Sequence, residues 1–302
     1  MTPTVSVVIP SYRGGPYLRE AVASIARQSF DQWETIVVAD GLTEDMSDLE
    51  RDPRVRVIRQ RQRGTSIARN VGVASARAAL VAFLDDDDRM VGERLHAQVV
   101  AMRDENIVLC HSQIRLIDDQ GDVYKAGYIR DYQYLDLLRI EGTPHLSASM
   151  VRRSVFQEVG GFTPLLRAGE DMDFIFKVAR EGALCFLPEV HTEYRVHANN
   201  TWAGQATVGA TSKSGLNLLL DEHLHAAQGR SDLPAVRAAV RAGRRHILPA
   251  RTQFDLERAG DALTRREYRP AAAFMARAMF RSPVASTLVV RTRLQRTRLN
   301  RR

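Results

Sequence analysis

The stretch of this sequence with the most evident chemistry is Ala79–Met90, where an apolar run ends abruptly in four aspartates, Asp85 to Asp88. A short apolar run bounded by charge is typical of a buried strand in a parallel sheet. Ligands of open α/β sheets bind beyond the carboxyl ends of the strands. We therefore expect these carboxylates to face a ligand crevice.

Four adjacent carboxylates repel one another unless a cation joins them. Oxygen ligands at this density suit Mg²⁺ or Mn²⁺, with phosphate oxygens completing the coordination shell. The alternative is a solvated acidic turn that caps the following helix, and for Asp88 this alternative stays open. The stretch predicts a divalent-metal site or, failing that, a helix cap.

Further polar residues follow other strands of the expected sheet. Tyr12 and Asp40 each come at the carboxyl end of a strand, so we expect both to face the same crevice. The Tyr12 ring can stack on a nucleobase, and the Asp40 carboxylate can accept an N–H from a pyrimidine edge. Arg63 and Arg69 supply positive charge near a diphosphate. The alternatives are ordinary turn residues for the first two and solvated cations for the arginines.

Two later segments add candidates for catalysis and metal binding. Glu170 and Asp171 open a helix, where carboxylates suit the positive end of the helix dipole. The same position holds a general base where a hydroxyl can reach it. His197 follows the last expected strand, and a neutral imidazole there is a candidate metal ligand. Helix capping for the acids and a structural role for the histidine are the alternatives.

An alternation of strands and helices positions these residues. Strands are expected at 5–10, where Pro10 ends the strand, and at 33–40, 55–58 and 80–84. Helices are expected from Pro16 and from Thr65 or Ser66, the latter reaching about Ala78. This spacing predicts an α/β fold with a doubly wound parallel sheet.

After the aspartates the regular alternation of strands and helices ends. Helices are expected at 93–103, 132–141 and 170–181, and strands at 107–118, 146–151 and 190–196, the first of them antiparallel in pattern. From about Val208 the chain is expected to be helical throughout, with breaks at its prolines. We expect a domain over 1–205 and a basic helical C-terminal region over 206–302.

Composition is that of an ordinary globular chain, with 44% hydrophobic and 26% charged residues. Residues 230–302 hold 18 Arg and 5 acidic residues, a net +13; since the chain carries +7, residues 1–229 carry −6. Cys110 and Cys185 lack metal-type spacing and are expected to be buried free thiols. No signal segment is evident, and no apolar run approaches the ~20 residues that cross a bilayer. We expect a cytoplasmic protein.

Roughly residues 4–203 resemble the family 2 glycosyltransferases, the large inverting group with a GT-A fold. The motifs occur in the family's order: VSVVIPSY, VVADG, RGTSIARNVGVASA, FLDDDD, SMVRRSVFQEVGGF, GEDMDF and YRVH. The resemblance implies a GT-A fold, with a mainly parallel sheet, a small antiparallel part and a C-terminal helical region. It also divides the first domain into a nucleotide-binding half, about 1–103, and an acceptor half, about 104–205.

The resemblance also implies roles for single residues. Asp171 corresponds to the catalytic base, and Glu170 to its partner in the acidic pair. Asp87 and His197 correspond to metal ligands, for Mn²⁺ or Mg²⁺. The positions that correspond to nucleotide-sugar binding are Pro10, Tyr12, Asp40, Arg69, Asp85 and Asp86.

An inverting hexosyltransferase is therefore implied. It would move a sugar from a nucleotide-diphosphate donor, with a UDP-sugar favoured, to a hydroxyl of a glycan or lipid-linked saccharide. Ala39 departs from the family, which often carries an acid there. The Q-x-x-R-W motif of processive, membrane-spanning members is absent. The resemblance is thus to the non-processive bacterial type.

Two other functions are compatible with this fold. Sugar-nucleotide nucleotidyltransferases open with a glycine-rich loop carrying Arg and Lys after the first strand, and Pro10–Gly15 matches that loop poorly. A GT-A interaction protein that has lost catalysis would not need Asp87, Asp171 and His197 together.

The segment after Pro283 combines apolar residues with six arginines, a pattern that suits an anionic membrane surface. No nucleic-acid partner is expected, because the tail lacks interleaved aromatic residues and residues 1–229 are acidic. We predict that the tail docks the enzyme peripherally at the inner face of the cell membrane. A solvated tail and a protein contact are the alternatives.

Overall fold

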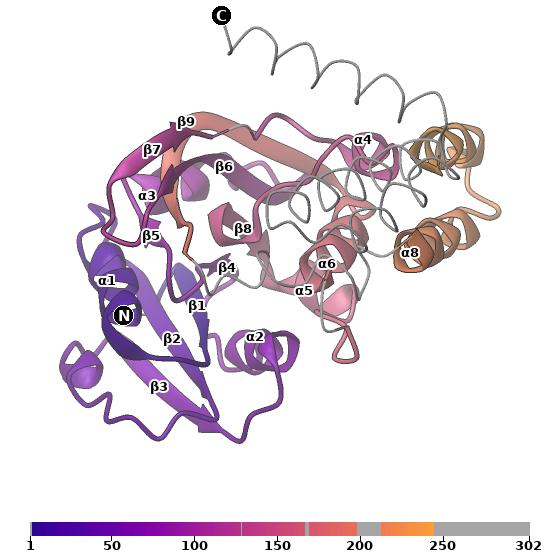
Figure 1. Cartoon of the computed structure of the whole chain (residues 1–302). Helices are drawn as coiled ribbons and strands as arrows, with labels where there is room; N and C mark the ends of the chain where they lie inside the picture. The colour runs from indigo at the N-terminus through magenta and orange to yellow at the C-terminus, as the bar shows by residue number, and fades with distance from the viewer. Residues whose placement is uncertain (1, 128, 167–168, 198–212, 245–302) are drawn as a thin grey trace, which may run out of the picture. The chain divides into compact units, whose positions relative to one another are not determined.

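The computed structural model of the chain describes residues 2–127, 129–166, 169–197 and 213–244 (Figure 1). The described strands form one sheet in the order β3-β2-β1-β4-β8-β6-β9-β5, with β7 paired to β6. Their bounds are β1 Val5–Ser11, β2 Trp33–Asp40, β3 Val55–Gln60, β4 Leu80–Phe83, β5 Arg89–Met90, β6 Ile107–Ile117, β7 Val123–Ala126, β8 Ser149–Arg152 and β9 Ala183–Arg195.

Helices connect most of these strands. They are α1 Gly15–Ala26, α2 Thr65–Ala74, α3 Arg94–Ala101, α4 Tyr134–Leu138, α5 Arg153–Glu158, α6 Glu170–Ala179 and α8 Lys213–Ala226, with short 3₁₀ turns η1 Leu49–Arg51 and η2 Leu146–Ala148. The chain divides into two compact units, one of Met1–Leu137 with Gly142–Ser212 and the other of Leu138–Glu141 with Lys213–Arg302. The domain boundary expected at 205/206 stays a prediction.

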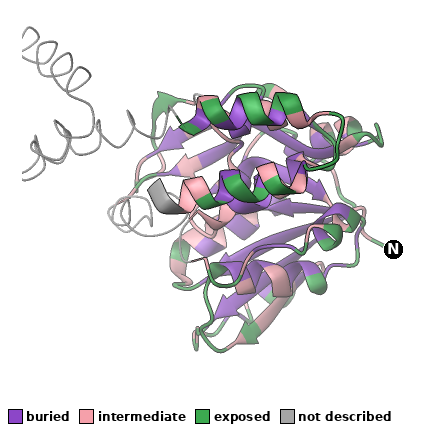
Figure 2. Cartoon of the chain, turned by 90° about the vertical axis from the view of Figure 1, so that its right-hand side faces the viewer, coloured by how far each residue is buried: buried purple, intermediate pink, exposed green. Residues whose placement is uncertain are grey.

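The parallel half of the sheet confirms the expected doubly wound arrangement. β1 pairs in parallel with β2 on one side and β4 on the other, and β2 pairs in parallel with β3. β1, β2 and β4 are buried throughout, β3 at the edge of the sheet is mostly only partly buried, and the helices expose one side to solvent (Figure 2). Sheets covered on both faces require such continuous apolar runs.

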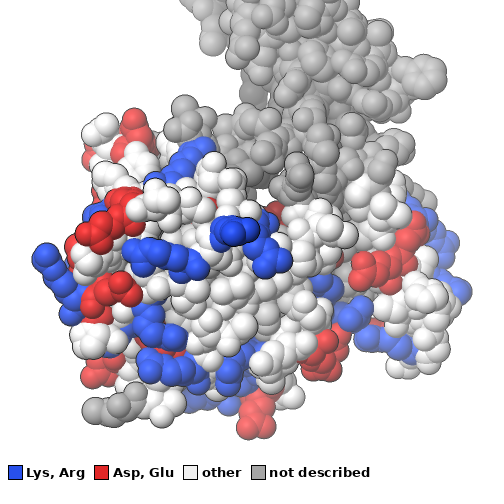
Figure 3. All heavy atoms as spheres, turned by 90° about the horizontal axis from the view of Figure 1, so that it is seen from below, with Lys and Arg blue, Asp and Glu red and all other residues white. Residues whose placement is uncertain are grey.

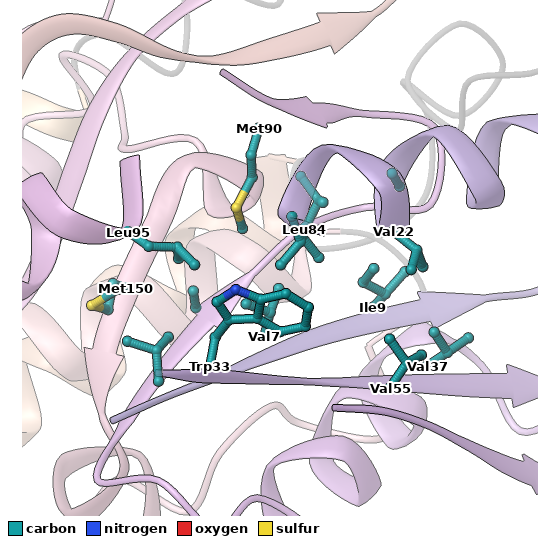
Figure 4. Close-up of a cluster of buried hydrophobic side chains, with 14 of the residues drawn as sticks. Val7, Ile9, Val22, Trp33, Val37, Val55, Leu84, Met90, Leu95 and Met150 are labelled. Atoms are coloured by element: carbon teal, nitrogen blue, oxygen red, sulfur yellow. The ribbon is translucent and has the colours of Figure 1, made fainter. Parts of the chain in front are cut away.

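Alternate residues of the strands form the core on each face of the sheet. Val7 and Ile9 of β1 lie in one buried cluster with Trp33 of β2 and Ile25 of α1 (Figure 4). On the opposite face β1 packs against α2, where a Cβ at Gly72 would lie 2.4 Å from the Val8 side chain. A glycine there lets α2 approach the sheet closely.

Three boundaries in the parallel half differ from expectation. β1 continues through Pro10 to Ser11. The backbone nitrogen of Pro10 faces β4 rather than β2, and the pairing with β4 already ends at Val8, so the missing N–H of Pro10 breaks no hydrogen bond of the sheet. α2 begins after Gly64, whose backbone φ is +94°, without a side-chain cap from Thr65 or Ser66. It ends at Ala74 rather than near residue 78.

The second half of the sheet mixes directions. β8 runs antiparallel between β4 and β6. The antiparallel character expected of β6 is found toward β7 and β8, whereas its pairing with β9 is parallel. The strand expected at 146–151 begins with the η2 turn, and the strand expected at 190–196 starts as early as Ala183. Cys110 and Cys185 are free thiols on β6 and β9, the first buried and the second partly buried.

The described surface carries interspersed charge. One face of the molecule shows basic and acidic side chains side by side (Figure 3). Residues 213–226 and 233–244 are helical, as expected. The remaining helices expected after 208, and the arginine-rich tail, lie outside the described residues. In the described part of the chain, no helix has the length and apolar character to cross a membrane.

Candidate active site

A buried arginine joins carboxylates from distant parts of the sequence. Arg69 on α2 is 3% exposed and donates one hydrogen bond of 2.8 Å to Asp85 after β4. Its other terminal nitrogen donates to Asp171 at 2.5 Å and Glu170 at 3.3 Å, both in the first turn of α6. The structure thus brings together one residue of the aspartate run, the arginine and the acidic pair.

The electrostatics of this cluster favour a proton acceptor near neutral pH. Burial opposes the charge of Arg69, but Asp171, Asp85 and Glu170 outweigh it and raise the pKa of the guanidinium. Withdrawal from water raises the pKa of Asp171 to about 7, against the lowering effect of Arg69. The Asp171 side chain is nevertheless 40% exposed, so a substrate hydroxyl can approach it.

Asp173, two residues further along α6, is differently placed. It is buried, accepts a hydrogen bond of 2.7 Å from the Thr163 hydroxyl, and pairs with Lys177 at 2.8 Å. Its carboxylate is therefore engaged within the protein. Of the three acids at the start of this helix, Glu170 and Asp171 are the two that contact Arg69.

The other aspartates of the run point to different partners. Asp86 accepts a hydrogen bond of 2.5 Å from the Ser11 hydroxyl at the end of β1, and burial raises its pKa to about 7. Asp88 is fully buried and accepts the backbone N–H of Arg195 at 2.9 Å, so it is a structural residue. Burial and neighbouring carboxylates raise the pKa values of Asp87 and Asp88. The repulsion expected from four adjacent aspartates is present.

Asp87 and His197, the two expected metal ligands, lie next to each other. The His197 Nε2 atom lies 2.9 Å from an Asp87 carboxylate oxygen. Among the described residues, no group of three or more His, Cys, Asp or Glu side chains is arranged to hold a metal. Magnesium in phosphate-handling enzymes is often held by one or two protein ligands with the phosphates supplying others. This pair fits a cation that the substrate helps to hold.

The residues expected to contact the nucleotide lie at the ends of β1 and β2. Tyr12 is 56% exposed, whereas Pro10 is buried within β1. Asp40 is buried, and its oxygens accept from the Gln60 side chain and from the backbone of Arg63 and Gly64, at 2.7–2.8 Å. In the described residues, no hydrogen bond or ion pair links Tyr12 or Asp40 to the carboxylate cluster. Their roles toward a base stay predictions.

Two buried arginines near the aspartate run were not singled out in the sequence. Arg195 on β9 donates to the Asp87 carbonyl at 2.9 Å and pairs with Glu20 of α1 at 2.6 Å. Arg94 on α3 is fully buried and donates to the Phe83 and Ser147 carbonyls at 3.0 and 2.6 Å.

These arginines fix the backbone from which the functional aspartates project. Arg195 stands two residues before His197 in the YRVH motif, and that position was an available signal. Arg94 gave none, because an arginine at the start of a helix is usually solvated.

In sequence, this chain resembles a known protein family over its N-terminal part. The family model for "Glycosyl transferase family 2" matches residues 6–160, just over half of the chain. An uncharacterized glycosyltransferase of Rickettsia bellii is 27% identical over 203 residues, which cover 65% of this chain and 29% of that protein. The chain spans about a third or less of the length of this and two other Rickettsia relatives.

Solved structures match the fold over most of the chain. S. aureus TarS 1-349, in complex with UDP-GlcNAc, superposes with a TM-score of 0.65 and 14% identity, covering 93% of this chain and 92% of that one. The mannosyltransferase PcManGT of Pyrobaculum calidifontis, in complex with GDP-Man and Mn²⁺, gives 0.63 and 16%, covering 98% and 80%. At these identities the likeness shows the fold, which is GT-A. With the match of the family model, it follows that the chain belongs to glycosyl transferase family 2.

Proposed function

We propose that this protein is an inverting, metal-dependent glycosyltransferase that moves a hexose from a nucleotide-diphosphate donor to a hydroxyl of a saccharide acceptor. A UDP-sugar is the favoured donor, since Asp40 stands where family members contact the base. The observation that carries the proposal is the bonding of Arg69 to Asp85, Glu170 and Asp171 together. It joins the aspartate run to a carboxylate able to accept a proton.

In the proposed reaction Asp171 removes the proton of the acceptor hydroxyl as that oxygen attacks the anomeric carbon. Attack opposite to the departing diphosphate inverts the configuration. The pKa of about 7 suits this role, because a general base works best when its pKa is near the operating pH. Arg69 orients Asp171 and keeps it from repelling Asp85 across the crevice.

Asp87 and His197 would hold a divalent cation, Mn²⁺ or Mg²⁺, whose charge offsets that of the departing diphosphate. Ser11 orients Asp86 beside them through its short hydrogen bond. Asp85 is fixed from two sides, because Arg69 binds its carboxylate and the Ser147 hydroxyl accepts its backbone N–H at 3.0 Å. The chain thus supplies a preorganised set of carboxylates, which reduces the reorganisation needed during reaction.

The acceptor is proposed to be a glycan or a lipid-linked saccharide. The arginine-rich tail after Pro283 supports a peripheral position at the inner face of the cell membrane, since each basic residue near an anionic surface contributes roughly 1 kcal/mol of binding. An inactive GT-A interaction protein is disfavoured by the Arg69 cluster, which a pure binding protein has no need to keep buried.

A panel of UDP- and GDP-sugars tests the proposal. We expect one donor to raise the melting temperature of the protein in the presence of Mn²⁺ and to be hydrolysed slowly without an acceptor. Hydrolysis should stop in excess EDTA and return on adding Mn²⁺ or Mg²⁺. A protein that neither binds nor hydrolyses any donor with either metal would favour the interaction-protein alternative.

A further inference from the structure

Asn70, the residue after Arg69 on α2, is hydrogen-bonded to a turn that lies 92 residues further along the chain. Its side-chain oxygen accepts the backbone N–H of Phe162 at 2.9 Å, and its amide nitrogen donates to the Phe162 carbonyl at 2.8 Å. One side chain thus satisfies both backbone groups of one residue. Two such bonds fix orientation as well as distance.

The turn, residues 160–163, is shaped to receive this side chain. A Cβ at Gly161 would lie 2.7 Å from the Asn70 oxygen and 2.8 Å from the Phe156 ring, and the backbone φ of Gly161 is +65°. No larger residue fits there without displacing Asn70 or the ring. Gly161 therefore has two roles, since it provides the positive φ of the turn and leaves room for close contact with α2.

Helix α6 holds the same turn from the other side. Lys177 donates to the Gly161 carbonyl and to the Thr163 hydroxyl, both at 3.1 Å. Thr163 in turn donates to Asp173 at 2.7 Å. The turn is consequently fixed to α2 through the Asn70 side chain and to α6 through the side chains of Lys177 and Asp173.

The side chain of Phe162 also contacts Arg69 of the candidate active site. The Phe162 ring lies 5.3 Å from the Arg69 guanidinium, within cation–π range, and stacks on Phe174 of α6 at 4.3 Å. A shift of the turn would therefore move the surface against which Arg69 is packed.

We propose that Asn70 is a positioning residue of the transfer reaction, which fixes the 160–163 turn and thereby sets the distance between Arg69 on α2 and Asp171 on α6. This inference rests on the proposed function of the site, in which Asp171 is the base. The Asn70 side chain donates one hydrogen bond to the backbone of Phe162 and accepts another from it. It acts through the turn, on which both helices converge.

Loss of this positioning has a signature that a merely structural role lacks. The charged groups that act on Asp171 are Arg69 of α2, Asp85 after β4 and Glu170 of its own helix. Arg69 lowers the pKa of Asp171, whereas the two carboxylates raise it. If Arg69 moves away, the Asp171 carboxylate should titrate at higher pH.

The test compares Asn70→Ala with Gln133→Ala. Gln133 makes the same kind of two-bond contact, at 2.9 and 3.2 Å, with the backbone of Leu184 near the start of β9. Asn70→Gln keeps the amide with one more methylene and serves if the alanine variant does not fold. Melting temperature, donor hydrolysis against pH, and carboxyl ¹³C titration of Asp171 are measured, the signal being assigned from its loss in Asp171→Asn.

Both alanine variants are expected to melt at lower temperature than the parent. Only Asn70→Ala should lower kcat, by ~10-fold or more, with little change in the donor KM, because small misplacements at a reacting centre are costly. It should also move the Asp171 titration upward by about half a pH unit or more. Asn70→Gln should show smaller changes in the same direction.

An unchanged Asp171 titration in Asn70→Ala would overturn the inference, and so would a kcat loss equal to that of Gln133→Ala. The carboxyl titration does not depend on turnover. A parent protein that hydrolyses no donor therefore contradicts the proposed function alone, while the titration still decides the role of Asn70.

Discussion

Asp171→Asn is expected to lower the rate of sugar transfer ~10²-fold or more while donor affinity stays nearly unchanged. The amide keeps the size of the side chain but cannot accept the proton of the acceptor hydroxyl. Arg69 retains Asp85 and Glu170 as partners, so the fold should hold. Turnover is measured by release of nucleoside diphosphate, and affinity by calorimetry with that diphosphate.

The pH dependence of the transfer rate tests the same role of Asp171 independently. Because the pKa of Asp171 is raised to about 7, its base form is scarce well below that pH, and the parent rate should rise through about pH 6–8 and level off above. The residual rate of Asp171→Asn should lack this rise. Glu181→Gln, two residues after the end of α6 and paired with Arg180, serves as the control with parent activity. Loss of donor affinity together with rate would make Asp171 a donor contact instead.

Asp87→Ala is expected to abolish metal-stimulated activity without loss of stability. The substitution removes one member of a repelling row of carboxylates, so the melting temperature should hold or rise slightly. Activity should fall to the level measured in EDTA, since His197 alone is a weak cation ligand. Calorimetry of Mn²⁺ binding in the presence of nucleoside diphosphate should show the same loss.

Asp119→Ala is the matched control for this variant. Asp119 is an exposed aspartate that contacts Arg195 through its backbone carbonyl, so the substitution should change neither activity nor metal binding. Parent-like turnover of Asp87→Ala would contradict the metal assignment. A large fall in its melting temperature would instead favour the structural alternative, in which the aspartates cap a turn.

The parallel half of the fold was predictable because local pattern and tertiary environment agree there. The span of β2 was predicted to the residue, as an apolar run that ends in Asp40. The second half was less predictable, since strands such as β9 are only partly buried and carry Pro188 and two glutamates. Packing against β6 overrides that weak local signal.

The candidate site was partly predictable for a similar reason. Residues at the ends of strands and at the first turn of a helix converge by topology, which explains why Asp85, Arg69 and Asp171 could be grouped from sequence. The contacts of Asn70 with Phe162, and of Arg94 with backbone carbonyls, have no such signal. Each of these contacts joins a side chain to backbone atoms. Because every residue type has the same backbone atoms, the sequence does not reveal which residue the side chain will contact.

The anomeric configuration of the first-formed product tests the central claim most directly. With an α-linked nucleotide-sugar of gluco or galacto configuration as donor, proton NMR of the fresh reaction should show the β-linked product, identified by its large anomeric coupling. That result is the one predicted if Asp171 activates the attacking hydroxyl opposite the diphosphate. An α-linked first product would contradict the account, because the sugar would then have been transferred with retention.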